Sequence, residues 1–133
     1  LPKEVRKNIS LICDVSPEVY AFTDRSLLAL CLNNLISNAY KYGKENGHIR
    51  VSLRHDTDKV LISIKDDGIG ISPENLPKIW ERFYQTDASR SSDINQRGLG
   101  LGLSMVSQIC KLLGIAAEVR STLGEGSEFT LKF

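Results

Sequence analysis

The sequence lacks a long apolar run and a surplus of charge of one sign. The longest unbroken apolar run, Leu27 to Leu32, is far too short to cross a bilayer, which takes roughly 20 residues. Lys and Arg number 17 against 16 acidic residues, so no basic surplus favours nucleic acid or an anionic membrane as a partner. Any phosphate must therefore be bound locally, by backbone amides and a few side chains.

Cysteine is also scarce and scattered. Cys13, Cys31 and Cys110 are odd in number and show neither a CxxC pair nor metal-ligand spacing. This pattern favours a reducing compartment, in which buried cysteines act as small hydrophobic residues. The chain begins Leu1-Pro2-Lys3-Glu4, without an initiator methionine or a signal peptide. We therefore expect a domain of a longer protein.

Length and periodicity predict one α+β domain over residues 1–133, with an apolar fraction of 41%. The predicted helices run from the N-cap Asp24 to Tyr42 with Gly43 as a left-handed stop, from Ser72 to about Arg82, and from Leu101 to Leu113 before Gly114. The predicted strands are Ile9–Val15, Val19–Phe22, His48–His55, Lys59–Asp66, Ala116–Thr122 and Glu128–Phe133. Together they predict a two-layer α/β sandwich, a mixed sheet of about five strands with helices on one face.

Amide side chains gather on one side of the first long helix. At about 100° per residue, one side carries Asn34, Asn38, Lys41 and Tyr42. Asparagine is unfavourable inside helices because its amide competes for the backbone, so two of them one turn apart need a reason. One explanation is a solvated face. The other is chemical: asparagine oxygens suit Mg²⁺ that also holds phosphates, Lys41 offsets phosphate charge, and Tyr42 packs on a base.

Two glycine-rich segments follow. In the first, Asp66 to Gly70, the glycines permit positive φ and close backbone approach, and Asp66 can accept a hydrogen bond from an exocyclic amine such as that of adenine. Alone, this segment is more typical of an ordinary turn. The second, Gly98 to Leu103, has glycine at every second position before a helix, which offers amides and the positive end of the helix dipole to phosphates. Neither a dinucleotide fingerprint nor a Walker loop fits its spacing.

In this order the segments resemble the catalytic ATP-binding domain of bacterial sensor histidine kinases, in the gyrase–chaperone–kinase ATPase superfamily. The resemblance covers nearly the whole chain. It includes the asparagine segment Asn34–Tyr42, both glycine segments, an aromatic motif at Trp80–Tyr84 and a closing turn at Gly124–Ser127. The resemblance implies a Bergerat-type sandwich with a lid at about residues 84–97.

The resemblance also implies site residues. Asn38 would ligate Mg²⁺, with Asn34 and Lys41 acting in catalysis at the metal and the phosphates. Tyr42 would stack on the base, and Asp66 would bind the adenine amino group. The other ATP-binding residues that it implies are Gly68, Gly70, Ile71, Phe83, Arg90, Arg97, Gly98, Leu99, Gly100, Leu101, Gly102, Leu103 and Ser127.

For some of these residues an ordinary structural role is an equal alternative. Phe83 is either the lid's aromatic anchor or a core residue. Gln85 stands where many family members have arginine, so phosphate contact would pass to Arg90 or Arg97. Those two arginines are otherwise solvated charges.

Asn34 indicates which branch of the superfamily the chain resembles. Hydrolytic members have a water-activating glutamate at this position, and an amide cannot act as a general base. This favours a protein-histidine kinase over an energy-coupling ATPase, with a nucleotide-binding module without transfer as the other alternative.

The acceptor histidine is missing from the sequence. His48 and His55 stand at the two ends of one predicted strand, outside any helical setting for an acceptor. The resemblance thus implies Mg²⁺-dependent transfer of the γ-phosphoryl group of ATP to a separate dimerisation domain of the same parent protein, without autophosphorylation. A response regulator would act downstream in two-component signal transduction. The resemblance further implies a cytoplasmic domain, without direct membrane contact, of a parent anchored in the bacterial inner membrane.

Overall fold

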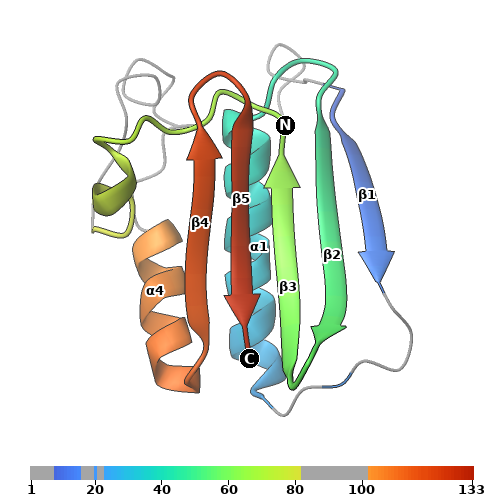
Figure 1. Cartoon of the computed structure of the whole chain (residues 1–133), viewed down its shortest axis with the longest axis vertical. Coiled ribbons are helices and arrows are strands. Elements are labelled where there is room, and N and C mark those ends of the chain that lie inside the picture. The colour runs from blue at the N-terminus through green and yellow to red at the C-terminus, as the bar shows by residue number, and fades with distance from the viewer. Residues whose placement is uncertain (1–7, 16–19, 21–22, 82–101) are drawn as a thin grey trace.

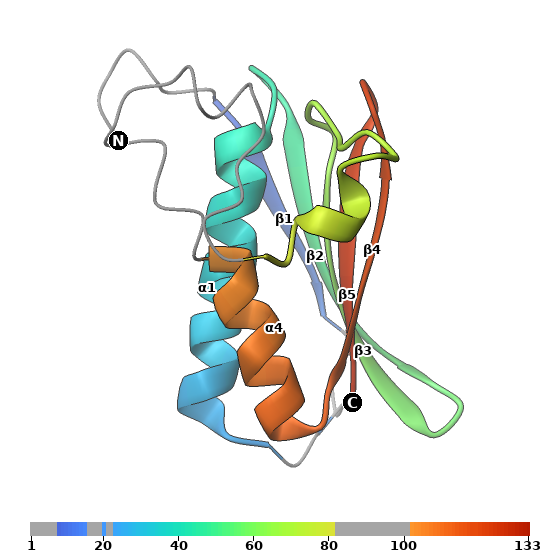
Figure 2. The same cartoon turned by 90° about the vertical axis from the view of Figure 1, so that its left-hand side faces the viewer.

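The computed structural model describes residues 8–15, 20, 23–81 and 102–133. These residues form two layers, seen edge-on in Figure 2. One layer is a five-stranded sheet, and the other consists of the helices α1 (Arg25–Tyr42) and α4 (Gly102–Leu113). Both helices lie on the same face of the sheet, as Figure 1 shows with the strands in front.

The sheet is mixed, with the order β1-β2-β3-β5-β4. Its strands are β1 (Ser10–Val15), β2 (His48–Asp56), β3 (Lys59–Asp66), β4 (Ala116–Thr122) and β5 (Gly126–Lys132). β1 pairs with β2 in parallel, and the other neighbours are antiparallel. The predicted α+β sandwich, with a mixed sheet and helices on one face, is confirmed.

The core lies between the two layers. Because side chains alternate along a strand, Ile62 and Ile64 of β3 face the helices, and so do Phe129 and Leu131 of β5. The helices contribute buried residues that include Cys31, Leu35, Ala39, Val106, Ile109 and Cys110.

Cys31 and Cys110 are buried, as expected of cysteines that act as small hydrophobic residues. Burial raises the pKa of the Cys31 thiol to about 12 and also raises that of Cys110, so both stay protonated and pack as apolar groups. Cys13 on the edge strand is exposed.

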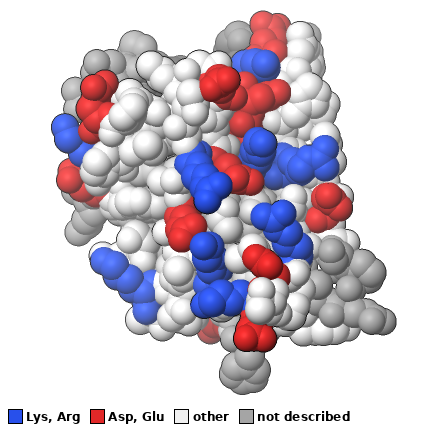
Figure 3. Space-filling model, viewed as in Figure 1, with Lys and Arg blue, Asp and Glu red and all other residues white. Residues whose placement is uncertain are grey.

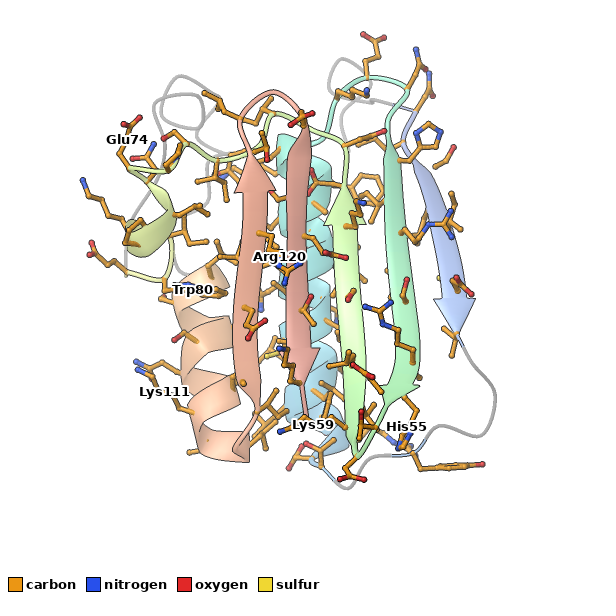
Figure 4. All side chains as sticks on the ribbon, in the orientation of Figure 1. His55, Lys59, Glu74, Trp80, Lys111 and Arg120 are labelled. Atoms are coloured by element: carbon orange, nitrogen blue, oxygen red, sulfur yellow. The ribbon has the colours of Figure 1, made fainter. Side chains whose placement is uncertain are left out.

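The open face of the sheet carries charges of both signs. Figure 3 shows Lys and Arg interspersed with Asp and Glu across it. Glu128 lies between Lys65 and Arg120 in the strand register, and Figure 4 labels Arg120 on this face. Lys132 Nζ lies 3.0 Å from Glu118 Oε1. The mixture gives this face no strong field of one sign, as the composition predicts.

The ends of the helices agree with the predictions except at Gly43. Asp24 caps α1, with its Oδ1 accepting a hydrogen bond from the Leu27 amide at 2.9 Å. Gly43 follows α1 with φ −70° and ψ 160°, so the predicted left-handed stop is wrong there. Gly114 after α4 has φ +73° and does supply such a stop. Neither described helix is long and apolar enough to cross a membrane.

The predicted helix from Ser72 to Arg82 is also wrong. Within the described residues 72–81, only a short 3-10 helix, Leu76–Lys78, forms. Pro77 explains this, because inside a longer helix it would remove a backbone hydrogen bond and clash with the carbonyl four residues earlier. The predicted strand over residues 19–22 lies outside the described residues except for Tyr20, which is not in a strand.

Candidate functional site

The amide-rich side of α1 meets the first turn of α4. Asn34 Nδ2 donates a hydrogen bond to the Leu30 carbonyl at 2.9 Å and lies 3.7 Å from Met105 Sδ. A Cβ built on Gly102 would lie 3.3 Å from Asn34 Oδ1, so the amide oxygen points at the start of α4. The amino end of a helix attracts negative charge. Asn34 and Gly102, predicted from separate segments, thus lie side by side.

The first glycine segment packs on the C-terminal end of α1. The Ile69 amide donates to the Tyr42 carbonyl at 3.1 Å. Gly68 leaves no space for a side chain, because a Cβ would overlap that same carbonyl oxygen. Close approach, rather than positive φ, explains the glycine at this position. Lys41 and Tyr42 are half-buried here, with Lys41 Nζ 5.4 Å from the Tyr42 ring centroid, and burial lowers the pKa of Lys41.

Asp66 ends β3 with only 7% of its surface exposed. Its Oδ1 accepts a hydrogen bond from the Gly68 amide at 2.9 Å. Burial raises the pKa of Asp66, although hydrogen bonds from the Gly68 and Ser127 amides oppose the shift. Ser127 is its cross-strand neighbour on β5 and is also buried. The result is a buried carboxylate between two strands, next to the end of α1.

The β4–β5 hairpin fixes the rest of this segment. Gly70 has φ +72°, as predicted, and a Cβ there would overlap the Thr122 carbonyl oxygen. The Gly124 amide donates to the Ile69 carbonyl at 2.7 Å, and the Ile71 amide donates to Ser121 Oγ at 2.7 Å. The segment is therefore held from both sides by hydrogen bonds.

One contact of this region has no signal in the sequence. Asp67 accepts hydrogen bonds from the His48 amide at 2.8 Å and from His48 Nδ1 at 3.0 Å, and Lys44 Nζ lies 3.9 Å away. His48 is exposed, as predicted, but it also ties the start of β2 to the first glycine segment. Residues 19 positions apart give no periodic pattern from which this pair could be found.

The amides that the sequence singles out on α1 fit a metal ion that keeps water and phosphate ligands. Among the described residues, no group of three or more His, Cys, Asp or Glu side chains could hold an ion. The predicted donors on α1 are the amides of Asn34 and Asn38, which are half-buried one turn apart. Mg²⁺ keeps several waters and takes few protein ligands when it also binds phosphates. The donors therefore fit an ion that arrives with a phosphate compound.

The structure describes only part of the predicted phosphate-binding segment. Gly102 and Leu103 lie in the first turn of α4, and Leu103 packs against the core. In the aromatic motif, the Trp80 ring packs edge-on against Phe129 at 5.7 Å between centroids, beside the sheet in Figure 4. The predicted lid and seven predicted site residues lie outside the described residues: Phe83, Arg90, Arg97, Gly98, Leu99, Gly100 and Leu101.

Comparison with known proteins identifies the class of this domain. Residues 23–133 match the family described as histidine kinase-, DNA gyrase B-, and HSP90-like ATPase. The chain belongs to this family, as the catalytic, ATP-binding domain of a sensor histidine kinase.

One curated relative is the phosphate regulon sensor protein PhoR of Pseudomonas aeruginosa. It is 36% identical over 127 residues, which are 96% of this chain and 28% of that protein. The chain thus spans little more than a quarter of this relative's length.

Two solved structures support the same assignment. Full-length ShkA in complex with AMPPNP has a TM-score of 0.81 and 32% identity, over 95% of this chain and 25% of ShkA. The catalytic domain of the histidine kinase ThkA has a TM-score of 0.79 and 26% identity, over 96% of this chain and 80% of that domain. The match to the ThkA domain spans most of both chains.

Proposed function

We propose that the chain, as one domain over residues 1–133, binds ATP with Mg²⁺ and transfers the γ-phosphoryl group to a histidine. That histidine lies on the dimerisation domain of the same parent protein, and a response regulator acts downstream. The parent is anchored in the bacterial inner membrane, with this domain on the cytoplasmic side. The observation that carries the proposal is the buried carboxylate of Asp66 beside the end of α1.

In this proposal the base binds at Asp66. An ionised carboxylate only accepts hydrogen bonds, so Asp66 suits the amino group of adenine and repels the carbonyl oxygen that guanine carries in the same place. The Gly68 amide, at 2.9 Å, fixes the orientation of the carboxylate. Tyr42 stacks on the base, and Gly70 and Ile71 border it.

The phosphates extend along α1 toward the amino end of α4. Asn34 Oδ1 already points at Gly102 there, and Asn38 and Lys41 lie on the same side of α1. Asn38, assisted by Asn34, would hold Mg²⁺, which when bound neutralises charge on the triphosphate. Lys41 contacts phosphate oxygens. We extend the proposal to Phe83, Arg90, Arg97 and residues 98–101 on the phosphate side, with a lid at about residues 84–97.

The contribution of the protein to transfer is positioning and charge. The bond from the γ-phosphorus to the bridging oxygen breaks as a bond to the acceptor imidazole nitrogen forms, and ADP leaves. A neutral imidazole is already a nucleophile, so the domain needs no general base to activate it. This agrees with Asn34, whose amide cannot take a proton from water.

The test is phosphoryl transfer from radiolabelled ATP to the dimerisation domain of the parent protein, supplied as a separate chain. Asn38→Ala should abolish transfer and weaken Mg²⁺-dependent binding. Asn33→Ala is the matched control, because Asn33 is exposed on the same helix. It should transfer at the wild-type rate.

Two results would contradict the proposal in different ways. Normal transfer by Asn38→Ala would refute the metal assignment. ATP binding by the wild-type chain without any transfer would instead indicate a nucleotide-binding module.

A further inference from the structure

The hydroxyl of Ser121, on β4, is a junction of three hydrogen bonds. Its Oγ lies 2.7 Å from the Ile71 amide, 2.9 Å from the Gly126 carbonyl and 2.8 Å from Ser127 Oγ. These partners come from the segment after the first glycine loop and from β5. Ser121 therefore connects the segment after the first glycine loop to Ser127, the cross-strand neighbour of Asp66.

The chemistry of the partners fixes the direction of every bond in this network. A hydroxyl has one hydrogen and two lone pairs. The Ile71 amide can only donate and the Gly126 carbonyl can only accept, so the single hydrogen of Ser121 goes to Gly126. The remaining lone pair of Ser121 must then accept the hydrogen of Ser127.

This arrangement determines what Ser127 can offer to a ligand. Its hydrogen is used on Ser121, so its oxygen can only accept further hydrogen bonds. Asp66 is its direct cross-strand neighbour, and both are more than 90% buried. The two side chains therefore present acceptors alone, which matches a group with two N–H bonds and opposes a carbonyl oxygen.

We propose that Ser121 is a specificity-determining positioning residue, which holds the Ser127 hydroxyl as an acceptor for the amino group of the base. This inference rests on the proposed function, because it presumes that a purine binds at Asp66. Ser121 itself does not touch the ligand in this account. It acts only through Ser127.

The experiment compares the affinity of the chain for ATP and for ITP, which carries an oxygen in place of the amino group. The variants are Ser121→Ala, Ser121→Thr, Ser127→Ala and the double variant with alanine at both positions. Ser63→Ala is the matched control, because it removes a buried hydroxyl of the same sheet that pairs with Thr130 at 3.3 Å. Affinities are measured by equilibrium titration at a temperature where each variant is folded.

We expect Ser121→Ala to lower the preference for ATP over ITP by about 3- to 10-fold, the size of one hydrogen bond. Once freed, the Ser127 hydroxyl can turn and donate to the oxygen of ITP. Ser121→Thr keeps a hydroxyl and should retain the preference, as should Ser63→Ala. Ser127→Ala alone should lower the preference for ATP over ITP. Adding Ser121→Ala to that variant should change the preference by less than about twofold, because the two residues act as one unit.

A folded Ser121→Ala variant with the wild-type preference would overturn the inference. The inference would also be overturned if Ser121→Ala lowered the preference for ATP as much in the Ser127→Ala background as in the wild type. The effect of Ser121 would then not pass through Ser127. If Ser121→Ala does not fold, Ser127→Ala decides: a full preference in that variant refutes the inference. A wild-type chain that fails to bind ATP would refute the proposed function instead.

Discussion

The two ends of the site are built differently. The end around Asp66 consists of backbone and short side chains packed so closely that Gly68, Gly70 and Gly126 leave no room for a Cβ. At the other end, longer side chains project from one face of α1, and Asn34, Asn38 and Lys41 are only half-buried. The proposed base-binding end is thus part of the folded sheet, whereas the proposed phosphate-binding side is the surface of a helix.

This difference predicts which functions can be removed without unfolding the domain. Substitutions at the base end alter backbone packing or leave buried amides unpaired, so they should lower stability and affinity together. Substitutions on the α1 side should lower function with little loss of stability.

The largest effect is expected from Gly126→Ala. Gly126 has φ +126°, and a Cβ there would overlap the Asp66 carbonyl oxygen. Strain and overlap together should lower the free energy of unfolding by about 3 kcal/mol. Gly124→Ala is the control on the same hairpin, since Gly124 has φ +85° with nothing within 4 Å of a Cβ, and should cost only about 1 kcal/mol. Equal losses in urea unfolding would contradict the close packing of the base end.

Asp66→Ala should have the next largest effect. Loss of a charged acceptor should weaken ATP binding by roughly 10- to 100-fold and remove most of the preference for adenine over guanine. The buried amides of Gly68 and Ser127 would also lose their acceptor, so stability should fall as well. Competition between ATP and GTP measures the preference, with the exposed Asp56→Ala as control. A preference in Asp66→Ala as large as that of the wild type would refute the role of Asp66 in base recognition.

A smaller and pH-dependent effect is expected from Asp67→Asn. Partial burial opposes ionisation of Asp67, but the His48 hydrogen bonds and the Lys44 charge outweigh it and lower the pKa of this carboxyl. A lowered pKa stabilises the fold above the unfolded value of 3.8, and the contribution disappears as pH falls through the folded pKa.

At pH 7 the variant should therefore lose up to about 1 kcal/mol, since the pair is partly exposed, and the difference from the wild type should shrink as the pH falls below 3.8 and through the folded pKa. Urea unfolding at several pH values measures this, with Asp58→Asn in the exposed β2–β3 turn as control. A loss of unfolding free energy that is the same at every pH would contradict an ionic origin of the stabilisation by Asp67.

The elements of the fold were predictable because their signals are local. α1 begins after the predicted cap Asp24 and ends at Tyr42, and β3 and β4 have the predicted bounds. Two predictions about helices were wrong: the helix expected after Ser72 and the left-handed stop expected at Gly43. Pro77 prevents the helix expected after Ser72, and Gly43 follows α1 in an extended conformation instead of the expected left-handed one.

The candidate site was predictable only in part. Asn34 and Asp66 stood out because amides and carboxylates are unusual in their sequence settings. Ser121 gives no such signal, because its partner Ile71 is 50 residues away and joins it only through the tertiary fold. The same holds for His48 and Asp67.

The most direct test of the separation between the two ends is the affinity for ATP with and without Mg²⁺ in the Asn38→Ala variant. We expect an unchanged melting temperature, an unchanged affinity without Mg²⁺, and loss of the gain in affinity that Mg²⁺ gives the wild type. A variant whose affinity still gains as much from Mg²⁺ as that of the wild type would refute the metal role of Asn38 on the α1 side.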